Sequence, residues 1–340
     1  MSNKPFITTY SMWRLFRDCR RACQLRYLDN LVPLQRSQAL RFGSVIHDCL
    51  EQWHGGAPME QVLRSIDATY IDRVADDDQR RDWHLATAMM RGYAARYPRE
   101  EFEPVVLEKP FEGPIVNPAT GAESRSFVLA GKVDGIVKQN GQFFLLEHKT
   151  AAQIDGSYLE RLWTDFQVTL YSWYVQEVLN IPIAGVIYNI LGKAKLQQAK
   201  GETEEEYEAR RAELLAKSKT GKTTAKQKVA ESDEDFQARL AEKYSDPAMF
   251  HRELLYLSRD QYEPLQSELW ELTQAFLDAR RRNVFYQNTS FCFHYNRPCP
   301  YYPLCASNNN PNVRDNLYET RDPHEELRCA DQETETLQTF

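Results

Sequence analysis

The dipeptide Asn140-Gly141 separates two runs of residues that alternate apolar and polar side chains. Asn-Gly is the favoured occupant of a two-residue type I′ turn, so the pattern predicts a β-hairpin whose register the turn sets. In that register Asp134 lies directly opposite Glu147, with the two side chains about 5 Å apart on one face. Side chains alternate along a strand, so Lys149 projects from the same face. The sequence therefore predicts two carboxylates and an ammonium group at one end of a hairpin.

This predicted trio is unfavourable without a partner, because like charges at that separation repel. A divalent cation removes the repulsion. Hard oxygen ligands suit Mg²⁺ or Mn²⁺, with water and a substrate phosphate completing the shell. Lys149 beside such an ion is placed to orient or deprotonate an attacking water and to offset charge on phosphorus. The alternative is an exposed strand end with ordinary ion pairing, which is the commoner explanation of an isolated motif of this kind.

The remaining elements follow from hydrophobic periodicity. Helical spacing begins at a Ser11 cap and runs through Cys23, and it is found again over 37–54, 60–96, 159–181 and 261–282. Strand character is found over 104–150, 183–191 and 250–259. The core order of helix, three strands, helix and strand predicts an α/β fold, with a mixed central sheet flanked by helices.

Composition divides the chain into five regions. They are an N-terminal helical region (1–100), a core (101–192), a charged and partly helical insertion (193–249), a return strand, helix and cysteine segment (250–306), and a polar tail (307–340). We expect the tail to be extended or loosely packed.

Two short basic stretches are candidates for phosphate contacts. Five lysines and no acid occur in 217–228, and Arg280, Arg281 and Arg282 precede the cysteine segment. Such residues bind phosphate by releasing counterions. Solvated surface charge is an equal alternative, because acidic runs beside the lysines nearly cancel them. The whole chain carries 42 Lys and Arg against 49 Asp and Glu, a formal charge of −7, which argues against broad affinity for phosphate.

The seven cysteines form two groups. Cys19, Cys23 and Cys49 lie near the start, and Cys292, Cys299, Cys305 and Cys329 near the end. The start of the chain has neither a basic nor an apolar leader region, so we expect a reducing, cytoplasmic location and metal or redox chemistry rather than disulfides. Four thiolates can hold a [4Fe-4S] cluster. Zinc is the competing metal, but its sites usually contain a closer pair of cysteines than these spacings provide.

Other functional classes are excluded by composition. Apolar residues make up 42% and aromatic residues 12% of the chain, too much for a disordered protein. No run approaches the roughly 20 apolar residues of a membrane span. The phosphate-binding pattern G-x(4)-G-K-[ST] of a helicase motor is absent, so any motor would be a separate partner.

Further motifs accompany the hairpin acids. They are 131–136 (GKVDGI) with 147–149 (EHK), 43–47 (GSVIH), 167–171 (QVTLY), S-x(4)-F-x-x-C from Ser11 to Cys19, and C-x(6)-C-x(5)-C at Cys292, Cys299 and Cys305. The first three resemble, in turn, three elements of the RecB-like branch of the PD-(D/E)XK nuclease superfamily. These elements are its signature, its helical GxxxH element and its QxxxY element. The cysteines resemble the iron-sulfur form shared by AddB-type and CRISPR-associated members.

The resemblance implies a restriction-endonuclease-like core and metal-dependent hydrolysis of DNA. It favours an exonuclease acting on single strands or DNA ends, in repair, recombination, phage or defence processing, with a possible helicase or repair partner. The roles it implies are Mg²⁺ or Mn²⁺ binding for His47, Asp134 and Glu147, action on the attacking water for Lys149, and substrate positioning for Gln167 and Tyr171.

For the cluster, the resemblance implies Cys292, Cys299, Cys305 and a fourth cysteine. Cys19 occupies the matching position, while Cys23 lies one helical turn away and is the alternative. Two other functions stay open at this point. One is a noncatalytic DNA-binding iron-sulfur subunit of a helicase-nuclease or defence complex, and the other is a zinc-based interaction module at the cysteine segment.

Overall fold

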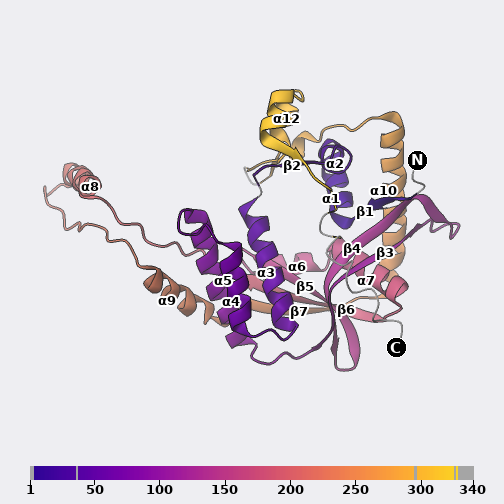
Figure 1. Cartoon of the computed structure of the whole chain (residues 1–340), viewed down its shortest axis with the longest axis horizontal. Helices are drawn as coiled ribbons and strands as arrows, with labels where there is room; N and C mark the ends of the chain where they lie inside the picture. Colours follow the sequence, from indigo (N-terminus) through magenta and orange to yellow (C-terminus); the bar gives the residue numbers. More distant parts are fainter. Residues whose placement is uncertain (1–3, 36, 295–296, 325–326, 328–340) are drawn as a thin grey trace.

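A six-stranded mixed sheet forms the centre of the molecule (Figure 1). The computed structural model describes residues 4–35, 37–294, 297–324 and 327. The strands are β1 (Phe6–Thr8), β3 (Glu103–Val116), β4 (Glu123–Gln139), β5 (Gln142–Ala151), β6 (Ile183–Gly192) and β7 (Phe250–Tyr256). Their order is β1-β4-β5-β6-β7, with β3 also paired to β4, and β1–β4 and β5–β6 are parallel. The predicted α/β core is therefore confirmed.

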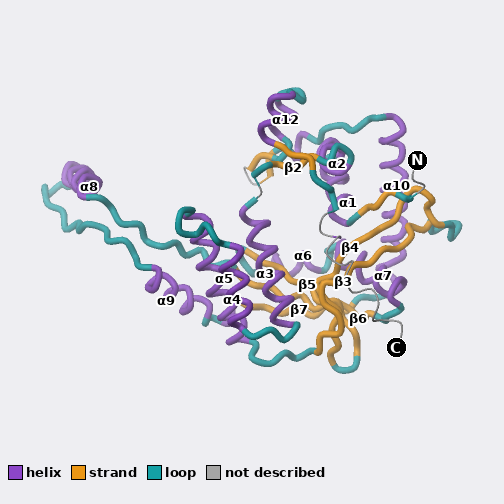
Figure 2. The backbone as a smooth tube through the Cα atoms, in the orientation of Figure 1, coloured by secondary structure: helices purple, strands orange, loops and turns teal. Residues whose placement is uncertain are grey.

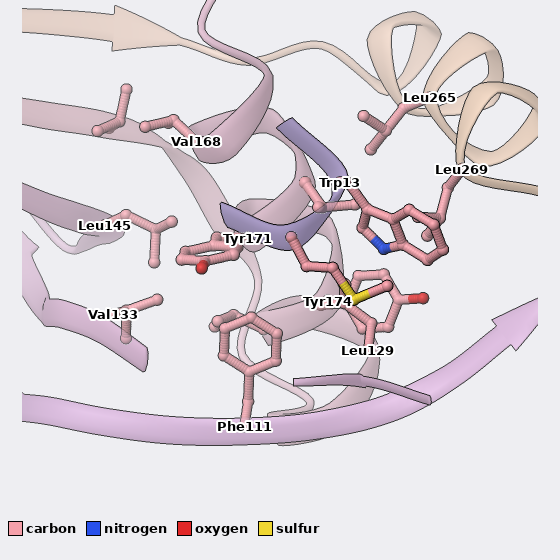
Figure 3. Packing of buried hydrophobic residues seen from close by; sticks show 14 of the residues in the cluster. Trp13, Phe111, Leu129, Val133, Leu145, Val168, Tyr171, Tyr174, Leu265 and Leu269 are labelled. Carbon is pink, nitrogen blue, oxygen red and sulfur yellow. The ribbon is translucent and has the colours of Figure 1, made fainter. Parts of the chain in front are cut away.

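Helices cover both faces of this sheet. One layer holds α3 (Gln38–His54), α4 (Met59–Thr69) and α5 (Asp77–Arg96), which pack in one buried cluster with residues of β6 and β7. The opposite layer holds α1 (Tyr10–Asp18), α6 (Gly156–Leu162), α7 (Phe166–Leu179) and α10 (Tyr262–Arg282) around the larger cluster. Figure 3 shows this packing, with the Trp13 ring of α1 among the leucines of α10 and the aromatic rings of α7.

The predicted hairpin turn is confirmed. Asn140 and Gly141 both have positive φ, 50° and 81°, as a type I′ turn requires. Pairing runs from Gln139–Gln142 to Gly135–Leu146 in the expected register. β1 pairs with β4 only at 127–129, on the edge that β5 uses further along. Residues 130–134 of β4 thus lie in a gap between β1 and β5, and this gap positions the candidate site.

Three of the predicted helices are interrupted, and one of them, over 159–181, is α6 and α7. The first is split at Cys19, whose extended backbone (φ −159°) ends α1 and precedes α2 (Arg20–Tyr27), and its cap is Thr9 rather than Ser11. The Thr9 hydroxyl accepts from the backbone N–H of Met12 and satisfies one free donor of the first turn. The predicted helix over 60–96 is two helices, because Asp76 caps a second one with its side chain.

The segment after Ala306 is more ordered than predicted. α11 (Tyr302–Ala306) is followed by α12 (Pro311–Leu317) and β10 (Tyr318–Thr320), and β10 pairs with β2 (Leu31–Pro33). A short hairpin of β8 (Phe293–His294) and β9 (Arg297–Pro298) precedes them. The two ends of the described chain therefore pack together, and the expectation of a loose tail is wrong for 311–320.

The charged insertion forms an arm that projects from the body (Figures 1 and 2). Two extended segments lead to and from α8 (Glu204–Lys217), which buries no residue. α9 (Asp233–Tyr244) returns to the body and packs against α5, burying Phe236, Leu240 and Tyr244. Among the described residues no helix is both long and apolar enough to cross a bilayer.

Candidate metal and active site

Three side chains converge at the gap in the sheet. His47 of α3, Glu108 of β3 and Asp134 of β4 each offer a ligand atom, and these atoms lie within 4.8 Å of one another. The imidazole Nδ1 of His47 is 3.2 Å from Oδ1 of Asp134. One imidazole and two carboxylates form a donor set that suits a divalent cation such as Mg²⁺ or Mn²⁺.

Glu108 lies on the first predicted strand, where its spacing left its approach to the metal open. Its backbone is left-handed, with φ 47°, which is rare for a residue with a β-carbon. The β3–β4 ladder continues on both sides of it, at Leu107–Gly135 and Lys109–Val133. Its carboxylate also pairs with the ammonium of Lys132. No local sequence signal marks this local backbone distortion.

The predicted pairing of Asp134 with Glu147 is wrong in its details. The ladder of β4 and β5 ends at Gly135–Leu146, one pair short of these residues. Instead, Oδ2 of Asp134 accepts the backbone N–H of His148 at 2.7 Å. This bond takes the place of a ladder hydrogen bond and turns the carboxylate towards His47. The two acids remain neighbours, since the charge of Asp134 acts on Glu147.

Glu147 and Lys149 form the second half of the site. The ammonium of Lys149 lies 2.6 Å from Oε1 of Glu147, 3.4 Å from Oε1 of Gln167 and 3.7 Å from Oδ2 of Asp165. Asp165 is the N-cap of α7 and accepts the backbone N–H of Gln167 at 3.0 Å. Sequence analysis missed Asp165, although an Asp just before a helical run is an N-cap signal.

The acids of the site control the pKa of His47. Burial alone lowers the pKa of His47, but the carboxylates of Asp134, Glu147 and Glu108 together raise it to about 9. Burial acts in the opposite sense on Asp134, yet the neighbouring His47 and the His148 N–H lower the pKa of Asp134 to about 2. An ion pair of His47 and Asp134 is therefore favoured at neutral pH in the metal-free protein.

Glu147 and Lys149 are also shifted. Burial raises the pKa of Glu147 to about 7, although Lys149 acts to lower it. Burial lowers the pKa of Lys149, but the charges of Glu147 and Asp165 outweigh it and hold that pKa above its ordinary value. At neutral pH Lys149 is therefore a cation.

Gln167 and Tyr171 lie one turn apart on α7. Gln167 reaches Lys149, whereas the Tyr171 ring is buried, 5.0 Å from the ring of Phe111. A β-carbon at Gly131 would lie 2.7 Å from the Phe111 ring and 2.8 Å from the Tyr171 ring. A larger residue at 131 would therefore displace these two rings.

The cysteine segment meets α1 away from the metal-binding side chains. Thiols of Cys19, Cys292 and Cys305 lie close enough to act on the pKa of Cys299, which burial raises. The backbone N–H of Asn288 donates to Sγ of Cys19 at 3.5 Å. Four cysteines, from 19 to 305 in the sequence, are thus brought to one place.

Cys23 points elsewhere. It is fully buried in the main core, and its thiol donates to the carbonyl of Met12 at 3.8 Å. Burial, with a smaller effect from the neighbouring Cys19, raises the pKa of Cys23. The helix break at Cys19 separates the directions of these two side chains. Cys329 lies outside the described residues.

Comparisons with known proteins agree with this geometry. A family model described as the PD-(D/E)XK nuclease superfamily matches residues 8–306. The matched range takes in His47, the hairpin and the cysteines up to Cys305. A search of curated proteins finds no match to the chain.

Proposed function

Because this chain belongs to the PD-(D/E)XK nuclease superfamily, whose members are metal-dependent nucleases, we propose that it is a DNA exonuclease. It hydrolyses phosphodiester bonds at the ends of DNA or in single strands. The observation that supports this most directly is the meeting of His47, Glu108 and Asp134 within 4.8 Å, next to the paired Glu147 and Lys149.

His47, Glu108 and Asp134 would hold Mg²⁺ or Mn²⁺, with Glu147 as a fourth candidate. The fit rests on the donor set itself, in which three groups from different elements converge without a hydrophobic reason to do so. The ion, when bound, supplies positive charge against the phosphate group. The His47 proton has to leave before Nδ1 can act as a ligand.

Lys149 and Glu147 would act on the attacking water. Lys149 keeps its proton at neutral pH, so its Nζ donates a hydrogen bond that orients the water and offsets negative charge on the phosphate. Glu147 has a pKa of about 7, which suits a carboxylate that accepts a proton from that water. Gln167, which contacts Lys149, would keep the ammonium group directed at the substrate.

The test is cleavage of end-labelled and circular DNA by anaerobically purified protein, with Mg²⁺ or Mn²⁺ added in turn. We expect Asp134→Ala, Glu147→Ala and Lys149→Ala each to lose at least 100-fold in rate, a typical contribution of one such group. Glu160→Ala, an exposed acid on α6, is the matched control and should cleave normally. Full activity in Asp134→Ala would refute the site. Binding of DNA without cleavage by the wild type would favour the noncatalytic subunit instead.

We further propose that Cys19, Cys292, Cys299 and Cys305 hold a [4Fe-4S] cluster. The convergence of their thiols supports it, as does the separate placement of Cys23. Such a cluster would join the two ends of the nuclease core. Free thiols and a bound cluster both fit a reducing compartment, the cytoplasm.

The cluster is tested by iron and sulfide analysis of protein purified without oxygen. We expect about four irons per chain and a brown charge-transfer absorption. Cys19→Ala should lose both, whereas Cys23→Ala, the matched control, should keep them. Zinc in place of iron, or equal loss in the two variants, would contradict the assignment.

A further inference from the structure

A groove of about 1400 Å³ lies along β3 and β4, and none of the residues of the proposed chemistry line it. Its floor is formed by β1, β3 and β4, and its walls by the ends of α2 and α10. Arg280 and Arg281 reach it from the last turn of α10, Arg125 from the start of β4, and Lys4 from the N-terminal segment. The sequence had marked the arginines of α10 as a candidate phosphate contact.

The groove and the metal site share one pair of strands, β3 and β4. Pro110 and Ala130 line it, and Glu108 and Asp134 lie further along the same strands. Pro110 pairs with Lys132, whose ammonium contacts Glu108. Residues two apart on a strand share a face, so Ala130, Lys132 and Asp134 lie on one face of β4, and a chain that follows the groove along β4 is directed to the metal site.

The charges that line the groove are mostly positive. Four cations, at Lys4, Arg125, Arg280 and Arg281, face two acids, at Glu112 and Asp322. Lys4 and the three arginines are exposed. Within the described part of the chain, these cations have no carboxylate partner, whereas the adjacent Arg282 pairs with Asp278 at 3.2 Å.

Part of the groove's lining is apolar. The Phe6 ring lies under the Arg280 guanidinium, 5.0 Å from ring to cation, and Leu28 and Pro110, both half-buried, also line the groove. A DNA duplex presents only phosphates and groove edges, so it has little use for an apolar floor. Single-stranded DNA exposes base faces as well as phosphates and uses both kinds of contact.

We propose that this groove binds the single-stranded DNA that leads into the metal site. Arg125, Arg280 and Arg281 contact its phosphates, and bases lie on the apolar floor. The assignment rests on the proposed nuclease function for its biological meaning, but binding can be measured without cleavage. It extends the substrate contacts several nucleotides beyond the scissile bond.

The experiment measures binding of a fluorescein-labelled 20-mer of thymidylate by anisotropy, with EDTA present so that no cleavage occurs. We expect Arg280→Glu/Arg281→Glu to weaken binding at least tenfold. The slope of log K against log salt should also fall by about 1.4, since each phosphate contact to a single strand contributes about 0.7. Arg282→Glu is the matched control, on the same helical turn but outside the groove, and should stay within twofold of wild type.

A second readout separates the groove from the catalytic residues. On a long single strand with Mn²⁺, the double variant should raise KM at least tenfold with kcat nearly unchanged, because the arginines do not contact the reacting atoms. On a four-nucleotide substrate, too short to fill the groove, it should match wild type.

Unchanged binding in the double variant, equal loss in Arg282→Glu, or tighter binding of a duplex than of the single strand would each overturn the proposal. A wild type that binds the 20-mer through these arginines but cleaves nothing would refute the nuclease proposal and leave the groove in place. Equal, normal cleavage by the wild type and the double variant at a low substrate concentration would refute the groove and leave the nuclease proposal in place.

Discussion

At the scale of single residues, Asp165 performs two tasks that a substitution can separate. Its Oδ1 caps α7, and its Oδ2 lies 3.7 Å from the Lys149 ammonium. Asparagine also caps helices, so Asp165→Asn should keep the stability of wild type but lose the charge that holds Lys149. We expect kcat to fall about tenfold, equivalent to ~1.4 kcal/mol, in steady-state cleavage assays.

Asp165→Ala is the comparison variant for this prediction. It removes the cap as well and should cost about 1 kcal/mol of unfolding free energy in urea titrations, in addition to the same loss of rate. Wild-type kcat in Asp165→Asn would show that the charge of Asp165 does not act on Lys149.

His54 of α3 links stability to pH. Its ring stacks on that of His148, with 5.3 Å between centroids. Burial, helped by the Arg252 charge, lowers the pKa of His54 to about 3, below the ordinary value of ~6.5. The folded state therefore favours neutral His54, and this stabilisation is complete above pH ~6.5 and is lost as the pH falls towards 3.

Substitution of His54 should flatten this dependence. As the pH falls from 7.5 to 5, wild type should lose more stability than His54→Gln. The difference in unfolding free energy between the two proteins should therefore shrink by up to about 2 kcal/mol, because one group contributes at most ~1.4 kcal/mol per pH unit. Urea titrations at the two pH values measure it. Parallel profiles for the two proteins would contradict the assignment.

At the scale of residues, spacing in the sequence predicted which side chains lie near one another. Asp134 and Lys149 were found from a turn and an alternation, and His47 from its motif, and the structure brings all three to one region. Spacing did not determine the place of Glu108, and Asp165 was not found. The first depends on a left-handed backbone within a strand, and the second on how α7 approaches β5. Both are tertiary properties.

At the scale of elements, the Asn140-Gly141 turn sets the register of the hairpin and can be tested directly. Gly141 has a φ of 81° and open space where a β-carbon would stand, so Gly141→Ala introduces backbone strain without a clash. We expect a loss of roughly 1–2 kcal/mol in unfolding free energy, measured by urea titration. Gly156→Ala is the matched control.

Gly156 also has open space, but it begins α6 and its φ is not positive. Its substitution should change stability by no more than about 0.5 kcal/mol. Equal effects at the two glycines would show that the positive φ of Gly141 is not what stabilises the turn.

Helix boundaries were predicted where a residue type common at helix ends marks them in the sequence. Ser37 precedes α3 and Gly55 follows it, and α10 occupies 262–282 against a predicted 261–282. The break at Cys19 was not predicted, because its apolar spacing continues across it into α2. Contacts with residues near 288 hold this break, and no local pattern reports contacts so distant in sequence.

At the scale of the whole molecule, the chain closes on itself. Residues near 20–33 meet residues near 288–324 through β2–β10 pairing, the hydrogen bonds of Asn288 and the buried Tyr301. Sequence analysis expected a link through cysteines alone. In the structure, Leu25, Leu31, Leu304 and Tyr318 also pack together at this junction. The two ends would therefore stay joined by apolar contacts even without the iron-sulfur cluster.

The arm is the part of the molecule that contributes least to this packing. α8 buries no residue, and the backbone N–H of Glu231 donates to the carbonyl of Ala199 at 3.0 Å, so the two limbs meet at the base of the arm. Replacing 200–230 by a two-residue Asn-Gly turn should therefore leave α9 in place. We expect the melting temperature to change by less than about 2 °C, because little apolar area is lost.

The contrast is with α9, whose Phe236 is 1% exposed. Phe236→Ala should cost about 3–5 kcal/mol of unfolding free energy, since it leaves a cavity between α9 and α5.

Metal-dependent cleavage of a short single strand should survive loss of the arm, because the arm begins beyond Gly192 and supplies none of the site residues. A large fall in melting temperature or in that cleavage rate on excision would mean that the arm supports the sheet edge from which it leaves.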